Sequence, residues 1–351
     1  MMRQVNLDCE GPITKNDNAL ELCQHFIPEG GRLFSLISRY DDFLADVLKR
    51  RSHKAGSTLK FILPFLKAYG ATNEKVRKYS LRNLILMPGA RKLLSSIKDR
   101  MPTFIISTSY RPYIEALCES VGFPLENTYS TSFDLDRYKL AQEEIRKLRE
   151  LTQEIISLPQ IDLSGVRKEE DLSSEAKKSI QRLDEIFNEE IFRMRCGRML
   201  REVNPMGGQE KAEAVLSSLR KTGGKLSEVM YIGDSITDVE ALQLIRQEGG
   251  VAISFNGNRY AIDSAEIACI SPHTFPLLIL AEIFYKEGRE GVMRQARRWP
   301  QGLDEKLREK LFTVIPFPCV EVIDEENRER LIRQSEEMRI GTRGMTIGGL
   351  G

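Results

Sequence analysis

The chain has 351 residues with 52 basic and 51 acidic side chains, which gives a formal net charge of +1. This balance provides no electrostatic reason to expect nucleic acid or an anionic membrane surface as a partner. A hydrophobic content of 41% is enough for a packed interior, and the length predicts two or three modules instead of a single core.

Cysteine usage and apolar runs indicate the compartment. The six cysteines include no Cys-x-x-Cys pair, and the three histidines have no partners at ligand spacing, so we expect reduced thiols and no structural zinc. The N-terminus leads directly into a predicted strand without a secretory signal. The strongly apolar stretch at 275–285 contains Glu282 and is too short to cross a bilayer. We therefore expect a cytoplasmic protein without direct membrane insertion.

The first predicted element is a strand over Gln4–Leu7, which is followed by Asp8, Glu10 and Gly11. The two-residue period of a strand turns Asp8 and Glu10 to one side, and Gly11 permits the turn that must come next. Both acids would then lie at the carboxyl edge of a sheet, where open α/β sheets bind their ligands.

Residues 16–84 and 136–203 are predicted to be helical. In the first range, apolar residues recur every three or four positions before a second strand is available to pack on, which favours a helical cap. The second range is a charged helical insertion, either a second lid or an arm for a protein partner. A charged helix face that is merely solvated is the alternative.

Further strands are predicted at 103–106, 127–133, 229–232, 250–255 and 265–270, and an apolar helix at 275–284. The strand at 229–232 ends in Gly233 and Asp234, with Asp238 four residues later and a helical pattern after it. Two acid-bearing strand ends, one near each end of a long segment, predict one divalent-metal site built from both.

The C-terminal extension, residues 301–351, has a different character, with a charged helix and a proline-containing segment. We expect it to pack on the core in part, and it is a second candidate surface, beside 136–203, for a protein partner. Residues 341–351 are glycine-rich and terminal, so they are expected to be disordered.

These motifs, in this order, resemble those of the haloacid dehalogenase (HAD) superfamily, whose members are mostly magnesium-dependent phosphatases and phosphotransferases. The first motif stands here as Asp8-Cys-Glu-Gly-Pro-Ile-Thr and the fourth as Gly233-Asp-Ser-Ile-Thr-Asp. Ser107 closes an apolar strand as in the second motif, and Lys211 follows a glycine pair as in the third. One difference is Glu10, which stands where the family usually has Asp.

The resemblance implies a Rossmann-like core with a central, mainly parallel sheet flanked by helices. The core would comprise residues 1–15, 85–135 and 204–300, with a helical cap at 16–84. It also implies a Mg²⁺-dependent phosphatase that forms an aspartyl phosphate on a small phosphorylated metabolite.

The resemblance also implies a role for each motif residue. Asp8 would be the nucleophile and Glu10 the acid–base. Ser107 and the backbone at Thr108 would bind the phosphoryl group, together with Lys211, which would neutralise charge on it. The implied metal ligands are Asp8, the backbone carbonyl of Glu10 and Asp234, with Asp238 completing or orienting the set.

Each role has a simpler alternative. Glu10 would be catalytically idle if its longer side chain misplaces the carboxyl group. Ser107 would be an ordinary strand-ending serine and Lys211 a solvated helix lysine. Asp238 would only support its turn.

Two alternatives at the level of function stay open. A phosphotransferase differs only in letting an alcohol replace water as the acceptor. The segment from Asp8 to Glu21 also resembles an archaeal group known as energy-converting hydrogenase A subunit R, which implies a subunit or interaction protein on the same fold.

Overall fold

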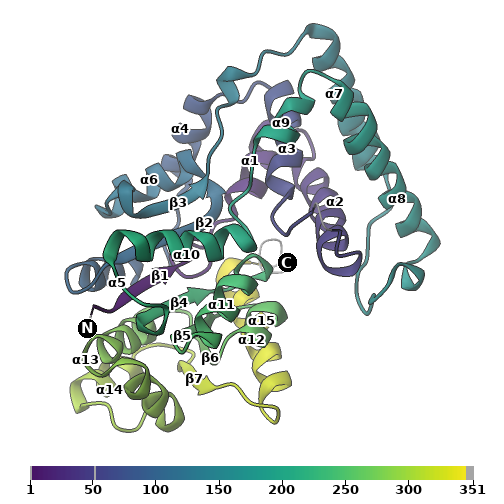
Figure 1. Cartoon of the computed structure of the whole chain (residues 1–351). Helices are drawn as coiled ribbons and strands as arrows, with labels where there is room; N and C mark the ends of the chain where they lie inside the picture. Colours follow the sequence, from purple (N-terminus) through teal and green to yellow (C-terminus); the bar gives the residue numbers. More distant parts are fainter. Residues whose placement is uncertain (1, 51–52, 345–351) are drawn as a thin grey trace.

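A computed structural model describes residues 2–50 and 53–344 (Figure 1). Its centre is a seven-stranded sheet with the order β3-β2-β1-β4-β5-β6-β7. The first six strands are parallel and β7 is antiparallel to β6. The strands are β1 Gln4–Leu7, β2 Thr103–Tyr110, β3 Thr128–Thr131, β4 Val229–Gly233, β5 Val251–Phe255, β6 Ile267–Ile270 and β7 Cys319–Val322. The predicted α/β class with a mainly parallel sheet is confirmed.

The register of the central strands places the two acidic motifs side by side. Leu7 of β1 pairs with Ile105 of β2 and with Ile232 of β4. The backbone N–H of Asp8 continues this ladder by donating to the carbonyl of Ile232 at 2.9 Å. Since the strands are parallel and level, both chains leave the sheet at the same edge.

Helices cover both faces of the sheet, as the alternation of side chains in β4 requires. Met230 and Ile232 belong to the apolar core under α5, α6 and α13, whereas Val229 and Tyr231 belong to the core under α10 and α11. The helices around the sheet are α5 Ala90–Lys98, α6 Arg111–Val121, α10 Gln209–Thr222, α11 Val239–Gln247, α12 Arg259–Ser264, α13 Phe275–Arg298, α14 Glu305–Phe312 and α15 Arg328–Arg343.

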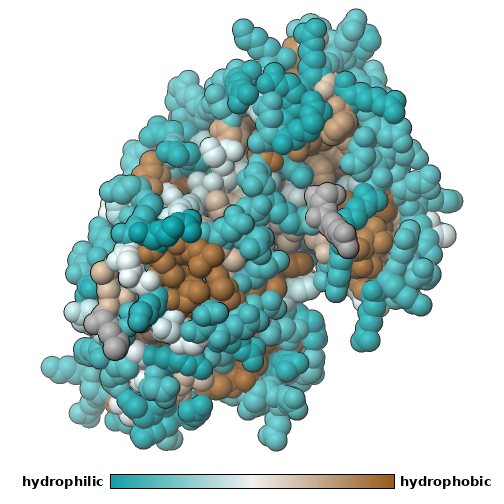
Figure 2. All heavy atoms as spheres, viewed as in Figure 1, coloured by the Kyte–Doolittle hydropathy of each residue, from teal (hydrophilic) through white to brown (hydrophobic). Residues whose placement is uncertain are grey.

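The other helices form a helical body beside the sheet, in which α4 also packs against α6 of the sheet layer (Figure 1). These are α1 Asn18–Phe26, α2 Gly30–Asp42, α3 Thr58–Ala68, α4 Asn73–Asn83, α7 Gln142–Ser157, α8 Ser174–Glu185 and α9 Gly197–Glu202, with π-helical turns at Phe43–Val47 and Ile186–Ile191. Residues from 16–84 and 136–203 share one apolar core within it. Phe61 and Phe187, for example, pack with ring centroids 4.4 Å apart, and Tyr40 donates to Asp184 at 2.8 Å. Hydrophilic side chains cover most of the outer surface over α7 and α8 (Figure 2).

The C-terminal extension is integrated into the core. β7 pairs with β6 in a segment whose prolines hide the strand pattern, and α15 packs against α12 and β6. The expectation of disorder from residue 341 is wrong for Gly341–Arg343, because α15 continues through Arg343 and its last turn is tied to the sheet edge. Residues 345–351, on which the rest of that expectation falls, lie outside the described residues.

Among the described residues, no helix is both long and apolar enough to span a membrane.

Candidate active site

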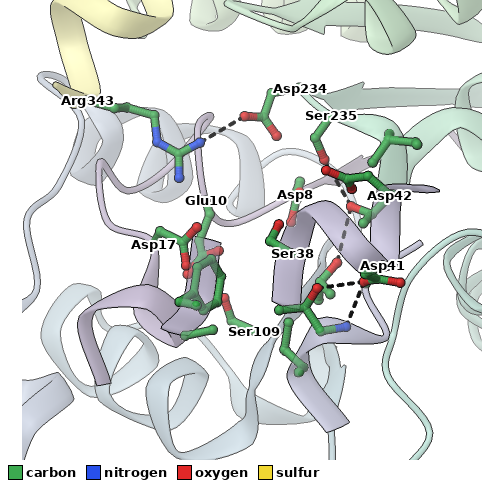
Figure 3. Close-up of a pocket in the computed structure, with 18 of the residues that line it drawn as sticks. Asp8, Glu10, Asp17, Ser38, Asp41, Asp42, Ser109, Asp234, Ser235 and Arg343 are labelled. Carbon is green, nitrogen blue, oxygen red and sulfur yellow. Dashed lines mark hydrogen bonds and ion pairs between the residues drawn. The ribbon is translucent and has the colours of Figure 1, made fainter. Parts of the chain in front are cut away.

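A cavity of about 120 Å³ lies between the carboxyl edge of the sheet and the helical body. Figure 3 shows acidic side chains from both parts pointing toward it. The loops after β1 and β4 form one wall, α2 and the start of α3 form another, and the end of α15 closes a third side. The ionisable residues that line it are Asp8, Glu10, Asp17, Asp41, Asp42, Asp234, Arg339 and Arg343.

Lys211 joins the two acidic motifs. Its ammonium group lies 2.7 Å from Asp8 Oδ2 and 2.7 Å from Asp238 Oδ1, and its side chain is fully buried. Lys211 reaches this point from the first turn of α10, which begins after Gly208 in a positive-φ conformation. The solvated-lysine alternative is therefore wrong, and Lys211 is the cation between the first and fourth motifs.

Asp238 is held on all sides by its own neighbours. Oδ1 also accepts a hydrogen bond from Tyr231 at 2.8 Å, and Oδ2 accepts the backbone N–H groups of Asp234 and Ser235 at 3.1 and 3.2 Å. Gly233 is required here, because a Cβ at that position would lie 2.6 Å from the Asp238 side chain. This arrangement fits the orienting role among the predicted functions of Asp238.

Asp234 contacts a part of the chain that the motifs do not include. Its Oδ2 forms ion pairs with Arg339 and Arg343 of α15, and the distance to Arg343 is 3.1 Å. A Cβ on Gly11 would lie 2.3 Å from the same oxygen, and φ at Gly11 is +100°, so only glycine fits. Asp8, Asp234 and Asp238 each offer an oxygen, and these oxygens all lie within 4.8 Å of one another.

Glu10 faces the cavity from the loop after β1. Its Oε1 accepts the N–H of Asn18 at 2.8 Å. Burial, with the charge of Asp17, raises the pKa of Glu10 to about 8, and the opposing charge of Arg343 does not cancel this. A carboxyl group with this pKa carries a proton near neutral pH.

The pKa values of Asp8 and Lys211 reflect a buried ion pair. Burial raises the pKa of Asp8 to about 8 despite the opposing charge of Lys211. Burial alone would lower the pKa of Lys211, but Asp238 and Asp8 raise it. Lys211 therefore stays charged, whereas Asp8 needs further positive charge to ionise fully at neutral pH.

The predicted phosphate-binding residues take different places. Thr108 lines the cavity and donates to Thr237 at 3.2 Å. The hydroxyl of Ser107 is buried and accepts the N–H of Ser109 at 3.1 Å, and Ser109, not Ser107, lines the cavity. β2 extends to Tyr110, four residues beyond the predicted end, so the residues that reach the cavity lie further along the strand than predicted.

The helical body contributes a second acidic wall. Asp41 accepts the N–H and hydroxyl of Thr58 at 2.6 and 2.7 Å, and its other oxygen lies 2.6 Å from His53 Nε2. Burial and the neighbouring Asp41 raise the pKa of Asp42 to about 7. Both acids lie in the last turn of α2, facing the cavity (Figure 3).

The sequence motifs do not mark several residues that line the cavity, among them Arg339, Arg343, Asp41 and Asp42. The two arginines are four residues apart on one helix, which places them on one face, but many charged pairs in this chain share that spacing. The two aspartates carry no motif. Only the folding of α2 and α15 onto the sheet edge brings them together.

The chemistry of the donor set fits a divalent cation. Ligands of an octahedral ion with bonds of about 2.1 Å lie roughly 3 to 4.2 Å apart. Oxygens of Asp8 and Asp234 within 4.8 Å reach such distances with small movements.

Comparisons with known proteins show the fold but not the activity. No protein-family profile and no curated protein sequence matches the chain. Among solved structures, the gene product AF1437 from Archaeoglobus fulgidus has a TM-score of 0.80 at 27% identity, covering 100% of this chain and 99% of that one. A substrate-bound phosphoserine phosphatase has a TM-score of 0.40 at 12% identity, over 76% of this chain and 92% of that one. A phospho-aspartyl intermediate analogue of phosphoserine phosphatase scores 0.39 at 12% identity over the same shares. The likeness to AF1437 extends along the whole chain, and the low phosphatase scores leave the function to be argued from the site.

Proposed function

We propose that the protein is a Mg²⁺-dependent phosphatase that hydrolyses a small phosphorylated metabolite through an aspartyl phosphate on Asp8. The observation that carries this proposal is the cluster at the sheet edge. Asp8 and Asp238 share the ammonium of Lys211 at 2.7 Å, Asp234 lies within the same group, and Asp8 faces a cavity. The resemblance of four motifs to the HAD superfamily supports the same assignment.

Asp8 would attack phosphorus as the nucleophile. Its Oδ1 accepts the N–H of Cys9 at 2.6 Å and its Oδ2 contacts Lys211, which fixes the orientation of the carboxylate. Lys211 would also neutralise charge on the transferring phosphoryl oxygens, the kind of fixed stabilisation on which phosphoryl transfer depends. A bond would form between an Asp8 oxygen and phosphorus as the bond to the leaving oxygen breaks.

Glu10 would supply the proton to the leaving oxygen and then accept one from the attacking water. Its pKa of about 8 keeps it protonated at neutral pH, and its hydrogen bond from Asn18 fixes the carboxyl group. The same bond holds the carboxyl group of this longer side chain, which lines the cavity.

Asp8 and Asp234 would hold Mg²⁺ through side-chain oxygens and Glu10 through its backbone carbonyl, with Asp238 orienting the set. The ion, when bound, would screen the charge between Asp8 and the phosphate dianion. Thr108 and Ser109, which line the cavity, would face the phosphoryl group, with Ser107 holding the Ser109 backbone. The helical body would act as the cap that limits the substrate to a small molecule.

The test is phosphate release from a panel of sugar phosphates, phosphoserine, nucleotides, phosphoglycolate and a generic aryl phosphate, with Mg²⁺ and with a chelator. Asp8→Asn should lose at least 10³-fold in kcat, because an amide cannot form the acyl phosphate. Asp99→Asn is the matched control, since Asp99 is exposed at the end of α5. Full turnover by Asp8→Asn, or equal turnover in chelator, would refute the proposal.

Product analysis in the presence of acceptor alcohols separates hydrolysis from phosphotransfer. The alternative of a hydrogenase-associated subunit predicts co-purification with hydrogenase proteins and no activity on this panel.

A further inference from the structure

The last two turns of α15 place two guanidinium groups on one carboxylate. Arg339 and Arg343 both contact Asp234 Oδ2, and the side chains of the two arginines are 6% and 5% exposed. Arg343 also donates to the carbonyls of Lys15 and Asn16 at 3.1 and 2.5 Å. α15 therefore ties the loop after β1 to the loop after β4, the two segments that build the proposed cation site.

Direct ion pairs bring three basic side chains to the acidic cluster, and the charges of Glu10 and Asp17 also face Arg343. The carboxylates of Asp8, Asp234 and Asp238 face three cations, which are Lys211, Arg339 and Arg343. Asp234 by itself carries one negative charge against two positive ones. A divalent cation that binds Asp234 must therefore approach two buried guanidinium groups.

Two opposite effects are possible for a group that contacts a metal ligand. A partner that fixes the orientation of the ligand typically strengthens metal binding by 10- to 100-fold. A charged partner of the same sign as the ion adds Coulomb repulsion, which is strong at buried distances of a few ångströms because solvent does not screen it. With two such partners, both nearly excluded from water, repulsion is the larger effect.

We infer that Arg339 and Arg343 are positioning residues that hold Asp234 and weaken cation binding, so that a bound cation and a docked α15 end compete for the same carboxylate. This inference rests on the proposed function for its cation site. Linkage requires the effect to be reciprocal: if docking of the α15 end lowers cation affinity, the cation loosens the α15 end by the same factor. The C-terminal extension thus tunes a site to which no motif assigns it.

Binding of Mn²⁺, followed by electron paramagnetic resonance on the full chain, measures the effect without turnover. Arg343→Gln and Arg339→Gln should each bind Mn²⁺ at least 10-fold more tightly than the native chain. Arg333→Gln is the matched control, because Arg333 is exposed on the same helix, and it should leave the affinity unchanged. Unchanged or weaker binding in both variants of the buried arginines would overturn the inference.

Hydrogen exchange on the native chain provides a measurement that does not depend on the variants folding. Saturating Mn²⁺ should speed amide exchange in the last turn of α15 and leave the first turn unchanged. Unchanged or slower exchange in that last turn would overturn the inference.

Asp234→Asn separates this inference from the proposed function. If that variant loses Mn²⁺ binding and phosphate release while the arginine variants bind as the native chain does, the phosphatase stands and the inference fails. If the native chain and Asp234→Asn bind Mn²⁺ equally, the cation site is elsewhere and the inference fails with it. If the arginine variants bind more tightly but no phosphate ester is cleaved, the inference stands and the phosphatase fails.

Discussion

Replacing Lys211 by methionine tests the buried ion pair at the centre of the site. Methionine has a similar length and no charge, so the change leaves Asp8 and Asp238 facing each other without their ammonium. Removing one partner of a buried pair costs about 3–5 kcal/mol, because the remaining charge is uncompensated. That is a large part of the roughly 5–15 kcal/mol by which proteins are stable.

Lys211→Met should lower the free energy of unfolding more at pH 8 than at pH 5. Lys211 lowers the pKa of Asp8, so its removal raises that pKa further. A carboxyl group whose pKa is higher in the folded chain than in the unfolded chain favours folding at low pH and loses this contribution as pH rises. The free energy of unfolding of Lys211→Met should therefore fall about 3–5 kcal/mol below that of the native protein at pH 8, with a smaller gap at pH 5.

Urea denaturation at pH 5 and pH 8 measures this difference. Lys225→Met is the control, since Lys225 is exposed after α10, and it should change the free energy of unfolding by less than about 0.5 kcal/mol. The double variant Lys211→Met with Asp238→Asn should recover part of the loss by removing one of the two facing charges. A loss below about 1 kcal/mol at pH 8, or an equal loss at both pH values, would refute the reasoning.

Three further predictions concern single contacts. Burial raises the pKa of Asp42 from 3.8 to about 7, so the ionised side chain destabilises the folded chain. Asp42→Asn should therefore increase the free energy of unfolding, by at most roughly 4 kcal/mol at pH 8 and by less at pH 5. An equal effect at both pH values would contradict this prediction. Gly11→Ala places a Cβ against Asp234 at φ +100°, and should lower both Mn²⁺ affinity and the melting temperature, whereas an unchanged melting curve would show that the loop relaxes. Tyr231→Phe removes a 2.8 Å hydrogen bond to Asp238, and should cost about 0.5–1.5 kcal/mol in urea denaturation; a gain in stability is the contrary result.

Much of the sheet is predictable from the sequence because its signals are local. The strand at Gln4–Leu7 matches the prediction, and the strand predicted at 229–232 gains only Gly233. Both are short apolar runs bounded by an acid or a glycine, and parallel strands buried on both faces have that pattern. β7 was not predicted, because nearby prolines hide it and its pairing with β6 depends on distant residues.

The first and fourth motifs also define part of the site. Each motif ends a strand at the same edge of the parallel sheet. The topology of the fold class therefore brings Asp8 and Asp234 together. The role of Lys211 as a cation follows from the third motif, and the structure adds its contacts with Asp8 and Asp238. The structure also shows which of Ser107 and Ser109 lines the cavity, a distinction that depends on where β2 ends.

The sequence by itself determined the fold class and the acidic pair at the edge of the sheet, because strand patterns and motif spacing are properties of neighbouring residues. Only the tertiary structure decided which charges surround that pair. Arg339 and Arg343 reach Asp234 across about a hundred residues of chain, and Asp41 and Asp42 reach the cavity from the helical body. Such partners are selected by how whole elements pack, and packing over long separations leaves no local pattern in the sequence.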